Sequence, residues 1–389
     1  MANDLTFTQI SSILADIVSN ATGNAVAVPI DTSSFVSVAQ KGLLAGYDPL
    51  ATAISQVLAR TIFSIRPYTE RFIGLRVSDQ KYGNHVRKLT ALDDDPVDSS
   101  VYALTDGSAV DQYTVRKPKV LQTNFYGEAT YQDFITIYTV QIDSAMSGPD
   151  EFASFISMII QNMSDRMTQR REELARMTLA NMIAAKSTAD SGNVIHLLRE
   201  YNAFVGGSFT ATTIRQAANW EPFIKWVYAR INNISDLMTA RSFKFHMNFT
   251  GQNIPRHTPY NRQKMYLSSF EGNYIDSAVL SSVFNADKLR MIDYQPVDFW
   301  QYIDYPGVVG VKPSYVNESG EVVNSQEEVE VENIFGVLFD DEALGYTVTD
   351  ESVERTPYNA RGKYWNQYYT DTKKYWNDLT ENFVLFVLD

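Results

Sequence analysis

The stretch from residue 147 to residue 186 constrains the fold most, because it reads as one long helix. It opens with a capping pair, a proline suited to a first helical turn, and two acids at the positive end of the helix dipole, in the order Ser147, Gly148, Pro149, Asp150 and Glu151. No further glycine or proline occurs before Gly192. The sequence therefore predicts an uninterrupted helix over 149–186.

This predicted helix changes character along its length. In its first half, apolar side chains recur every three or four residues and so share one face: Phe152, Phe155, Ile156, Ile159, Met163 and Met167. The stretch that follows, SDRMTQRREELAR, is mostly charged or polar. A helix of this length spans about 55 Å, well beyond an ordinary globular helix. The apolar stripe is too short and irregular for a coiled coil, so we interpret the helix as a spine that supports other layers. A shorter, ordinary core helix is the alternative.

The residues before the spine form two different kinds of segment. Residues 1–62 carry helical periodicity interrupted at Gly23, Gly46 and Pro49, which predicts a helical N-terminal arm that packs on another part of the protein. Residues 79–119 are polar and carry charges of both signs. We interpret them as a two-stranded arm that reaches away from the body and pairs with a neighbouring copy. A disordered loop is the alternative on composition alone.

Charged side chains of this second arm and of the spine are the candidate site residues. We expect them to make contacts between subunits. They are Lys81, Arg87, Lys88, Asp93, Asp94, Arg116 and Lys117 in the arm, and Arg166, Arg170 and Arg171 in the spine.

The remaining segments mix strands and helices without a regular alternation, which favours an α+β fold. Residues 130–142 and 242–249 read as strands, and the alternation in 242–249 puts His246 on a polar surface face. Residues 221–238, with Pro222 in the first turn, and 273–284 read as amphipathic helices. The apolar run 383–388 needs burial and predicts a strand within a sheet.

Signatures of catalysis and cofactor binding are missing from the sequence. There are no cysteines, which excludes disulfides and thiolate metal sites, and the four histidines stand singly. The glycine-rich nucleotide motifs and the nucleophile elbow are also missing. We expect no enzyme activity, no cofactor and no metal. An aromatic-rich hydrolase remains an alternative, because a glycosidase needs only two carboxylates that no motif marks.

The net charge of −13 comes largely from one segment. Between Lys312 and Arg355 there is no basic residue, and twelve acids occur: Glu318, Glu321, Glu327, Glu328, Glu330, Glu332, Asp340, Asp341, Glu342, Asp350, Glu351 and Glu354. We interpret this segment as a solvated acidic face, since the acids lack the spacing of an EF-hand calcium loop. A basic stripe for nucleic acid is not present. No apolar run suits a membrane span or a secretory signal, so we expect a protein made inside the cell and no membrane partner.

The C-terminal part resembles a known family. Its closing residues are similar to the end of the capsid domain in major capsid proteins of short-tailed bacteriophages of the phi-twenty-nine type, through Glu354-Arg355, Asn359, Arg361-Gly362, Tyr364-Trp365-Asn366, Tyr368-Tyr369 and the final NFVLFV. Three other stretches agree in kind and order with that family: DFITIYTVQIDSA, GPDEFASFISMIIQNM and NYIDSAVLSSVFNADKL. The similarity runs from about Phe63 to Val387.

The resemblance implies the Hong Kong 97-type phage capsid fold. Mapped onto this sequence, it implies an N-terminal arm at 1–62, a peripheral domain at 63–78, 120–190 and 353–389 with spine helix 149–186, an extended loop at 79–119 and an axial domain at 191–352. Because the sequence ends at Asp389, we expect it to lack the immunoglobulin-like domain that one branch of the family appends, and with it external decoration by that route.

The implied function is a major capsid protein that self-assembles, through pentamers and hexamers, into an icosahedral or prolate shell around double-stranded DNA. The shell would enclose that DNA without sequence-specific binding, form in the host bacterial cytoplasm and become the virion capsid. Few residues precede the extended loop, so we expect a separate scaffolding protein, and a portal protein as a further partner. An encapsulin-type compartment, which encloses a protein cargo, is the alternative.

Overall fold

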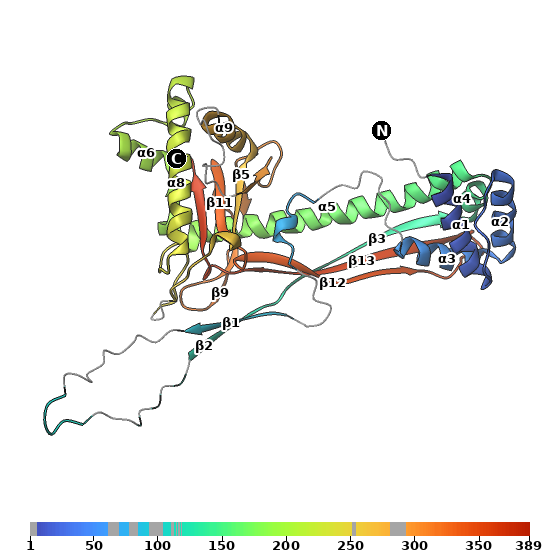
Figure 1. Cartoon of the computed structure of the whole chain (residues 1–389), viewed down its shortest axis with the longest axis horizontal. Coiled ribbons are helices and arrows are strands. Elements are labelled where there is room, and N and C mark those ends of the chain that lie inside the picture. The colour runs from blue at the N-terminus through green and yellow to red at the C-terminus, as the bar shows by residue number, and fades with distance from the viewer. Residues whose placement is uncertain are drawn as a thin grey trace. The chain divides into compact units, whose positions relative to one another are not determined.

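The computed structural model of the chain describes residues 6–60, 70–77, 85–92, 104–109, 113, 115, 117, 119–250, 254–280 and 293–389. The chain forms two compact units. Unit 1 consists of Met1–Tyr82, Glu128–Ala175 and Thr347–Lys374, and unit 2 of Gly83–Gly127, Arg176–Tyr346 and Tyr375–Asp389. Helix α5 and strands β12 and β13 run from one unit into the other (Figure 1).

The N-terminal helices of unit 1 share a core with later parts of the chain. The helices are α1 (Phe7–Thr22), α2 (Thr32–Leu44), α3 (Tyr47–Arg60) and α4 (Thr139–Ala145). Their apolar faces pack with the first turns of α5 and with Trp365, which is fully buried. Phe35 of α2 contacts Phe152 of α5 edge to face, with ring centroids 5.9 Å apart. The prediction that this segment packs on another part of the protein is confirmed.

Helix α5 (Pro149–Ala189) is the predicted long helix, ending three residues later than the sequence suggests. The Phe152 amide donates to the Gly148 carbonyl at its start, and Asp150 and Glu151 lie in the first turn. Phe152, Phe155 and Ile156 are buried, as their spacing predicts. The side chains of Ile159 and Met163 lie outside the described residues.

A three-stranded sheet completes unit 1, in the order β12–β13–β3. Its strands are β3 (Gly127–Tyr138), β12 (Leu344–Arg355) and β13 (Tyr364–Asn377). Side-chain hydrogen bonds join Thr130 to Thr372 and Thr136 to Asn366, so β3 and β13 run in opposite directions. The predicted strand 130–142 is therefore confirmed to Tyr138, beyond which the chain turns into α4.

Unit 2 is built on a mixed five-stranded sheet in the order β4–β14–β11–β5–β6. The strands are β4 (Val194–His196), β5 (Gln263–Ser268), β6 (Tyr294–Val297), β11 (Ile334–Asp340) and β14 (Phe383–Val387). Strand β14 pairs antiparallel with β11 and parallel with β4, and all its residues are buried. The run FVLFV is apolar at every position because both faces of this central strand are covered. The predicted C-terminal strand is confirmed.

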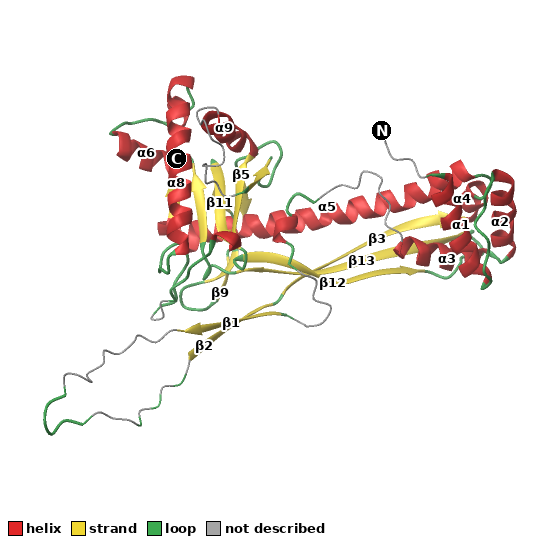
Figure 2. Ribbon diagram, viewed as in Figure 1, coloured by secondary structure: helices red, strands yellow, loops and turns green. Residues whose placement is uncertain are grey.

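Helices cover this sheet (Figure 2). They are α6 (Leu197–Val205), α7 (Ala211–Ile214), α8 (Ala217–Thr239) and α9 (Ser269–Leu280). Side chains of α6 and α8 share one core with β5, β11 and β14. Pro222 lies inside α8 and not in its first turn, because the helix begins at Ala217.

Shorter elements of unit 2 are β7 (Val309–Val311), β8 (Ser314–Val316), β9 (Val322–Asn324) and β10 (Val329–Val331), with 3-10 turns at Ser191–Asn193 and Tyr260–Arg262. A third 3-10 turn, Ile73–Leu75, lies in unit 1.

Strands β1 (Val86–Leu92) and β2 (Lys119–Phe125) form an antiparallel ribbon in unit 2. Their register runs from Val86 opposite Phe125 to Leu92 opposite Lys119. Within the predicted two-stranded arm, residues 86–92 and Lys119 are paired as expected, whereas the described residues 104–109 are not in a strand.

The predicted strand at 242–249 is wrong. Apart from isolated bridge positions at Ser242, which pairs with Arg256, and at Phe249, the segment is irregular, and Phe245 has a positive φ of 70° that ends any extended run. Phe245, His246 and Met247 are consecutive and all buried. Residues at odd and at even positions therefore both face the core, which a strand with one polar face would not allow. Alternation alone cannot distinguish a strand from a loop folded over a core.

His246 is consequently buried, which corrects its predicted surface position. Its Nε2 lies 2.7 Å from the Ile254 carbonyl oxygen, and its Nδ1 lies 2.9 Å from the Lys244 carbonyl oxygen and 3.2 Å from Asn382 Oδ1. Burial lowers the pKa of His246, more than these oxygens raise it.

We expect this histidine to make stability depend on pH. Its folded pKa lies below the ordinary 6.5, so the unfolded chain takes up a proton first as the pH falls. The free energy of unfolding should therefore decrease from pH 7 to pH 5. Denaturant unfolding at several pH values should show this slope flattened in His246→Gln and unchanged in His257→Gln, an exposed control. Equal slopes in both variants would contradict the assignment.

The two units differ from the predicted segments at several boundaries. Residues 375–389, 176–190 and the ribbon lie in unit 2, whereas residues 347–352 lie in unit 1. The largest difference concerns β14, which was expected with the spine but pairs with β11 and β4 of unit 2. Its apolar run finds burial on both faces there.

Candidate functional site

The structure places six of the ten predicted site residues. Lys81, Asp93, Asp94 and Arg116 lie outside the described residues. Arg87 and Lys88 lie in β1, Lys117 is exposed, and the three spine arginines lie in the unit 1 part of α5. Their contact with a neighbouring subunit stays a prediction.

Two of the spine arginines line a groove in unit 1. The groove has a volume of about 520 Å³ and lies between β3 and α5, lined by Tyr131, Gln132, Asp133, Arg166, Met167, Gln169, Arg170 and Glu173. Arg166 bonds Asp133 at 3.0 Å, and Arg170 bonds Glu173 at 2.6 Å. The side chains of Arg166 and Arg170 are 60% and 57% exposed. The hydrogen bond to Glu173 raises the pKa of Arg170. The groove thus offers both signs of charge to solvent.

Arg171, the next residue, has a different environment. Its side chain is only 15% exposed and bonds Asp371, which is 0% exposed, at 2.9 Å, and also Glu351. Burial lowers the pKa of Arg171, but Asp371 and Glu351 outweigh it, so the net shift is upward. Lys373 is also buried, with its Nζ 2.8 Å from Asp371 and 4.7 Å from the centroid of the Tyr131 ring. Burial lowers the pKa of this lysine. Arg171 therefore serves the interior of unit 1.

The ribbon has two different faces. Arg87, Leu89 and Ala91 are exposed, whereas the alternate residues of β1 are half-buried. Lys88 is among the latter and binds Asp378 and Glu381 within its own unit. No local sequence pattern predicts this pairing, because the two carboxylates lie 290 and 293 residues away from Lys88.

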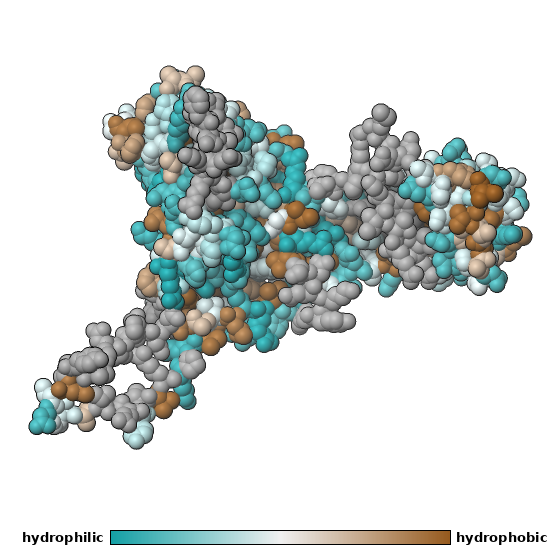
Figure 3. Space-filling view, in the orientation of Figure 1, coloured by the Kyte–Doolittle hydropathy of each residue, from teal (hydrophilic) through white to brown (hydrophobic). Residues whose placement is uncertain are grey.

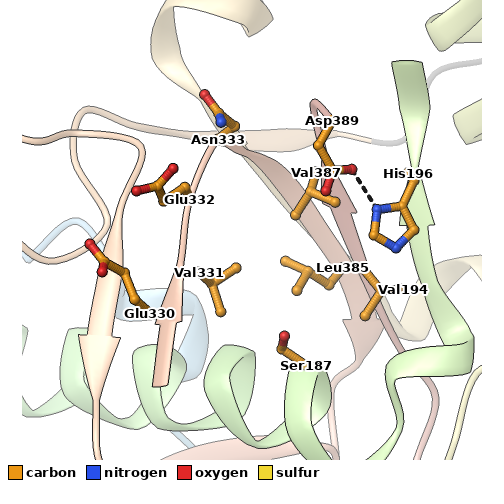
Figure 4. A pocket seen from close by; sticks show the side chains of 10 residues that line it. All are labelled: Ser187, Val194, His196, Glu330, Val331, Glu332, Asn333, Leu385, Val387 and Asp389. Atoms are coloured by element: carbon orange, nitrogen blue, oxygen red, sulfur yellow. Dashed lines mark hydrogen bonds and ion pairs between the residues drawn. The ribbon is translucent and has the colours of Figure 1, made fainter. Parts of the chain in front are cut away.

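A pocket of about 420 Å³ lies in unit 2 beside the edge strand β4 (Figure 4). Val194, Leu385, Val387 and Val331 line it together with the polar residues Ser187, His196, Glu330, Glu332, Asn333 and Asp389. His196 Nδ1 lies 2.5 Å from Asp389 Oδ1. Within the described residues, no group of three or more His, Asp or Glu is arranged to hold a metal ion.

Exposed apolar side chains gather at the end of α6 in unit 2, where Phe204 and Val205 point to solvent (Figure 3). Phe204 continues a cluster of aromatic rings through Trp226, with centroids 6.2 Å apart. In unit 1, Ile30 and Leu44 are also exposed. Such side chains are typical of protein interfaces.

The acidic segment is largely a solvated face, as predicted. Asp340 is buried and Asp341 half-buried, while the other ten acids of the segment are exposed. Asp340 accepts a hydrogen bond from Thr258, and burial raises its pKa. No helix among the described residues is both long enough and apolar enough to cross a membrane.

Solved structures similar to this chain are phage structures. The capsid structure of Staphylococcus phage Andhra contains a chain with a TM-score of 0.59 and 11% identity, covering 85% of this chain and 87% of that one. The structure of the head fiber and inner core protein of native bacteriophage P68 contains a chain with a TM-score of 0.53 and 10% identity, with the same coverage. At these identities the likeness shows the fold alone, which is the Hong Kong 97-type capsid fold. The predicted α+β class is confirmed.

Sequence comparison identifies the family. No curated protein sequence matches the chain. The family described as Phi29-like phage major capsid protein matches residues 46–387, which is most of the 389 residues. Neither an encapsulin compartment nor a hydrolase gains support from the comparisons. The chain therefore belongs to the Phi29-like phage major capsid protein family.

Proposed function

We propose that copies of this major capsid protein assemble as pentamers and hexamers into an icosahedral or prolate shell around double-stranded DNA. The family match over residues 46–387 is the observation that carries this proposal. A separate scaffolding protein and a portal protein are the proposed partners, as the resemblance implies. Assembly takes place in the cytoplasm of the bacterial host.

In this proposal unit 1 is the peripheral domain and unit 2 the axial domain. The ribbon of β1 and β2 is the base of the extended loop, here called the arm. The long helix α5 supports both domains, since it contributes to the core of each.

The arm of one copy is proposed to lie in the unit 1 groove of the next. Both partners carry mixed charge: the arm sequence has Asp93–Asp95 and the basic residues Arg116, Lys117 and Lys119, and the groove has Arg166 and Arg170 beside Asp133 and Glu173. Complementary charges of both signs fix register and suppress wrong partners more than they add affinity. The groove arginines are exposed enough to exchange their present partners for the acids of an incoming arm.

Reversing the charge of the groove should block assembly without unfolding the subunit. In Arg166→Glu/Arg170→Glu, two exposed ion pairs are lost, which costs under about 1 kcal/mol each. The same change repels the acidic segment of the arm. We expect a nearly unchanged melting temperature and a loss of shells, measured by sedimentation and negative-stain electron microscopy.

Lys225→Glu is the matched control, because Lys225 forms a comparable exposed pair with Glu221 on α8, outside the groove. This variant should assemble normally. Normal shells from the groove variant would refute the docking of the arm, and equal loss of shells in both variants would show only a general sensitivity to charge.

The shell is proposed to hold its DNA by confinement and without sequence-specific binding. A basic lining would grip the packaged DNA, since each phosphate contact with Lys or Arg releases counterions. The chain has a net charge of −13, and residues 318–354, which carry twelve of its acids, contain no Lys or Arg. Such a surface repels duplex DNA.

A further inference from the structure

The arm is tied to its own subunit by a small buried ion cluster. Its members, here called the clamp, are Lys88 on β1, Asp378 and Glu381 in the connection from β13 to β14, and Arg256. Lys88 Nζ lies 2.8 Å from Asp378 Oδ2 and 2.5 Å from Glu381 Oε1, and Arg256 Nη2 lies 3.0 Å from the same Glu381 oxygen.

The two carboxylates are set in the body of unit 2. Asp378 and Glu381 are 5% and 7% exposed, and Lys88 is 16% exposed. Asp378 Oδ1 accepts hydrogen bonds from the amide and hydroxyl of Thr380. Arg256 donates from Nε to the Thr380 carbonyl, and its Nη2 reaches Thr90 Oγ1 on β1 at 3.5 Å. Lys88 is thus the side chain that binds the ribbon to two buried carboxylates of the body, those of Asp378 and Glu381.

Beside the clamp the ribbon stands off from the body. A groove of about 450 Å³ lies there, lined by Lys88, Leu89, Thr90 and Ala91 on the ribbon side and by Ile254, Pro255, Arg256, His257 and Arg262 among others on the body side. At its other strand the ribbon continues through Tyr126 into β3 at Gly127. A Cβ at Gly127 would lie 2.5 Å from the Tyr375 carbonyl oxygen, so the chain passes close to the body there. The ribbon is thus held to the body at two places, by the clamp on β1 and by the continuation of β2 into β3.

We propose that the clamp sets the direction in which the arm leaves its own subunit, with Lys88 as its positioning residue. Lys88 then acts on assembly through the orientation of the arm and not by touching the neighbouring copy. This role goes beyond the proposed function. Its effect on shell assembly rests on that function, whereas its effect on the direction of the arm can be measured in a single subunit.

The charges of the clamp favour this role. Burial lowers the pKa of Lys88, but Asp378 and Glu381 outweigh it and the net shift is upward. Burial raises the pKa of Asp378, but Lys88 and the hydrogen bonds from Thr380 together outweigh it and the net shift is downward. Burial raises the pKa of Glu381 more than Lys88 and Arg256 lower it, so the net shift of this second carboxylate is upward. Removing the lysine leaves two buried carboxylates with Arg256 as their remaining cation, a strongly unfavourable arrangement. The charged Lys88 therefore keeps the ribbon bound to Asp378 and Glu381 of the body.

The absence of cysteine from the chain allows a direct measurement of arm direction. Spin labels at Val120→Cys on β2 of the ribbon and Ala218→Cys on α8, both exposed, report one distance by double electron–electron resonance. We expect a narrow distribution in the otherwise unchanged subunit. Lys88→Met should broaden it, and the conservative Lys88→Arg should restore it. Arg87→Met, on the exposed face of the same strand, is the matched control and should stay narrow.

A second variant covers the case in which Lys88→Met does not fold. Glu381→Gln keeps the volume and hydrogen-bonding capacity of the side chain, removes one charge of the clamp, and should also broaden the distribution. A narrow distribution in the folded Lys88→Met or Glu381→Gln subunit would overturn the proposal. Failure of the unlabelled wild type to form shells would instead count against the proposed function, and the distance measurement would still decide the role of Lys88.

Discussion

Replacing Arg171 with glutamate should destabilise the subunit by about 3–5 kcal/mol, the cost of breaking a buried ion pair. Asp371 is fully buried and Glu351 lies beside it, so the new carboxylate meets two like charges. Lys373 remains as the nearby cation, but its Nζ is already engaged with Asp371. Thermal unfolding followed by circular dichroism, together with urea unfolding, measures the loss.

Arg170→Glu is the matched control for this prediction. Arg170 precedes Arg171 on the same helix, but its pair with Glu173 is exposed, so the change should cost under about 1 kcal/mol. Its effect should appear in assembly. If both variants lose stability equally, the division of these neighbours into an interior and a surface residue is wrong.

Removing the arm should abolish shells and leave a folded subunit. The register of the ribbon shows where to cut: Leu92 and Lys119 lie opposite each other, so Asn-Gly in place of residues 93–118 closes a two-residue hairpin. This deletion preserves the ion pairs of Lys88 with Asp378 and Glu381. A deletion that also removed β1 would leave these two buried carboxylates without their lysine partner.

The expected phenotype separates assembly from folding. The melting temperature of the hairpin variant should stay close to that of the wild type, and sedimentation should show subunits or small oligomers where the wild type forms particles. Shells of normal size from the hairpin variant would contradict the proposed docking of the arm on a neighbouring copy.

Features with a local signature could be predicted from the sequence. The spine helix has a continuous periodicity and strong start signals, and the structure gives one helix over Pro149–Ala189. Every residue of the run 383–387 is apolar, as a central strand that is covered on both faces requires. The predicted strand around His246 is wrong because the alternating pattern belongs to a loop in which consecutive residues are buried.

The chemistry of the candidate site depended on contacts that sequence spacing cannot show. Arg170 and Arg171 are adjacent and look equivalent, yet a turn of 100° on the helix puts one in the groove and the other against Asp371. The sequence predicts Lys88 as one of several arm charges that contact another subunit, but the structure pairs it with carboxylates at the far end of its own chain. Only the folding of β13 and β14 beside the ribbon brings these groups together.

Negative-stain electron microscopy of the purified, concentrated protein tests most directly whether this chain builds a shell. The sample is examined alone, with polyethylene glycol as a crowding agent, and after co-expression with a scaffolding protein. We expect closed icosahedral or prolate particles of uniform size in at least one of these conditions. Dispersed subunits under all three conditions would contradict the proposed assembly.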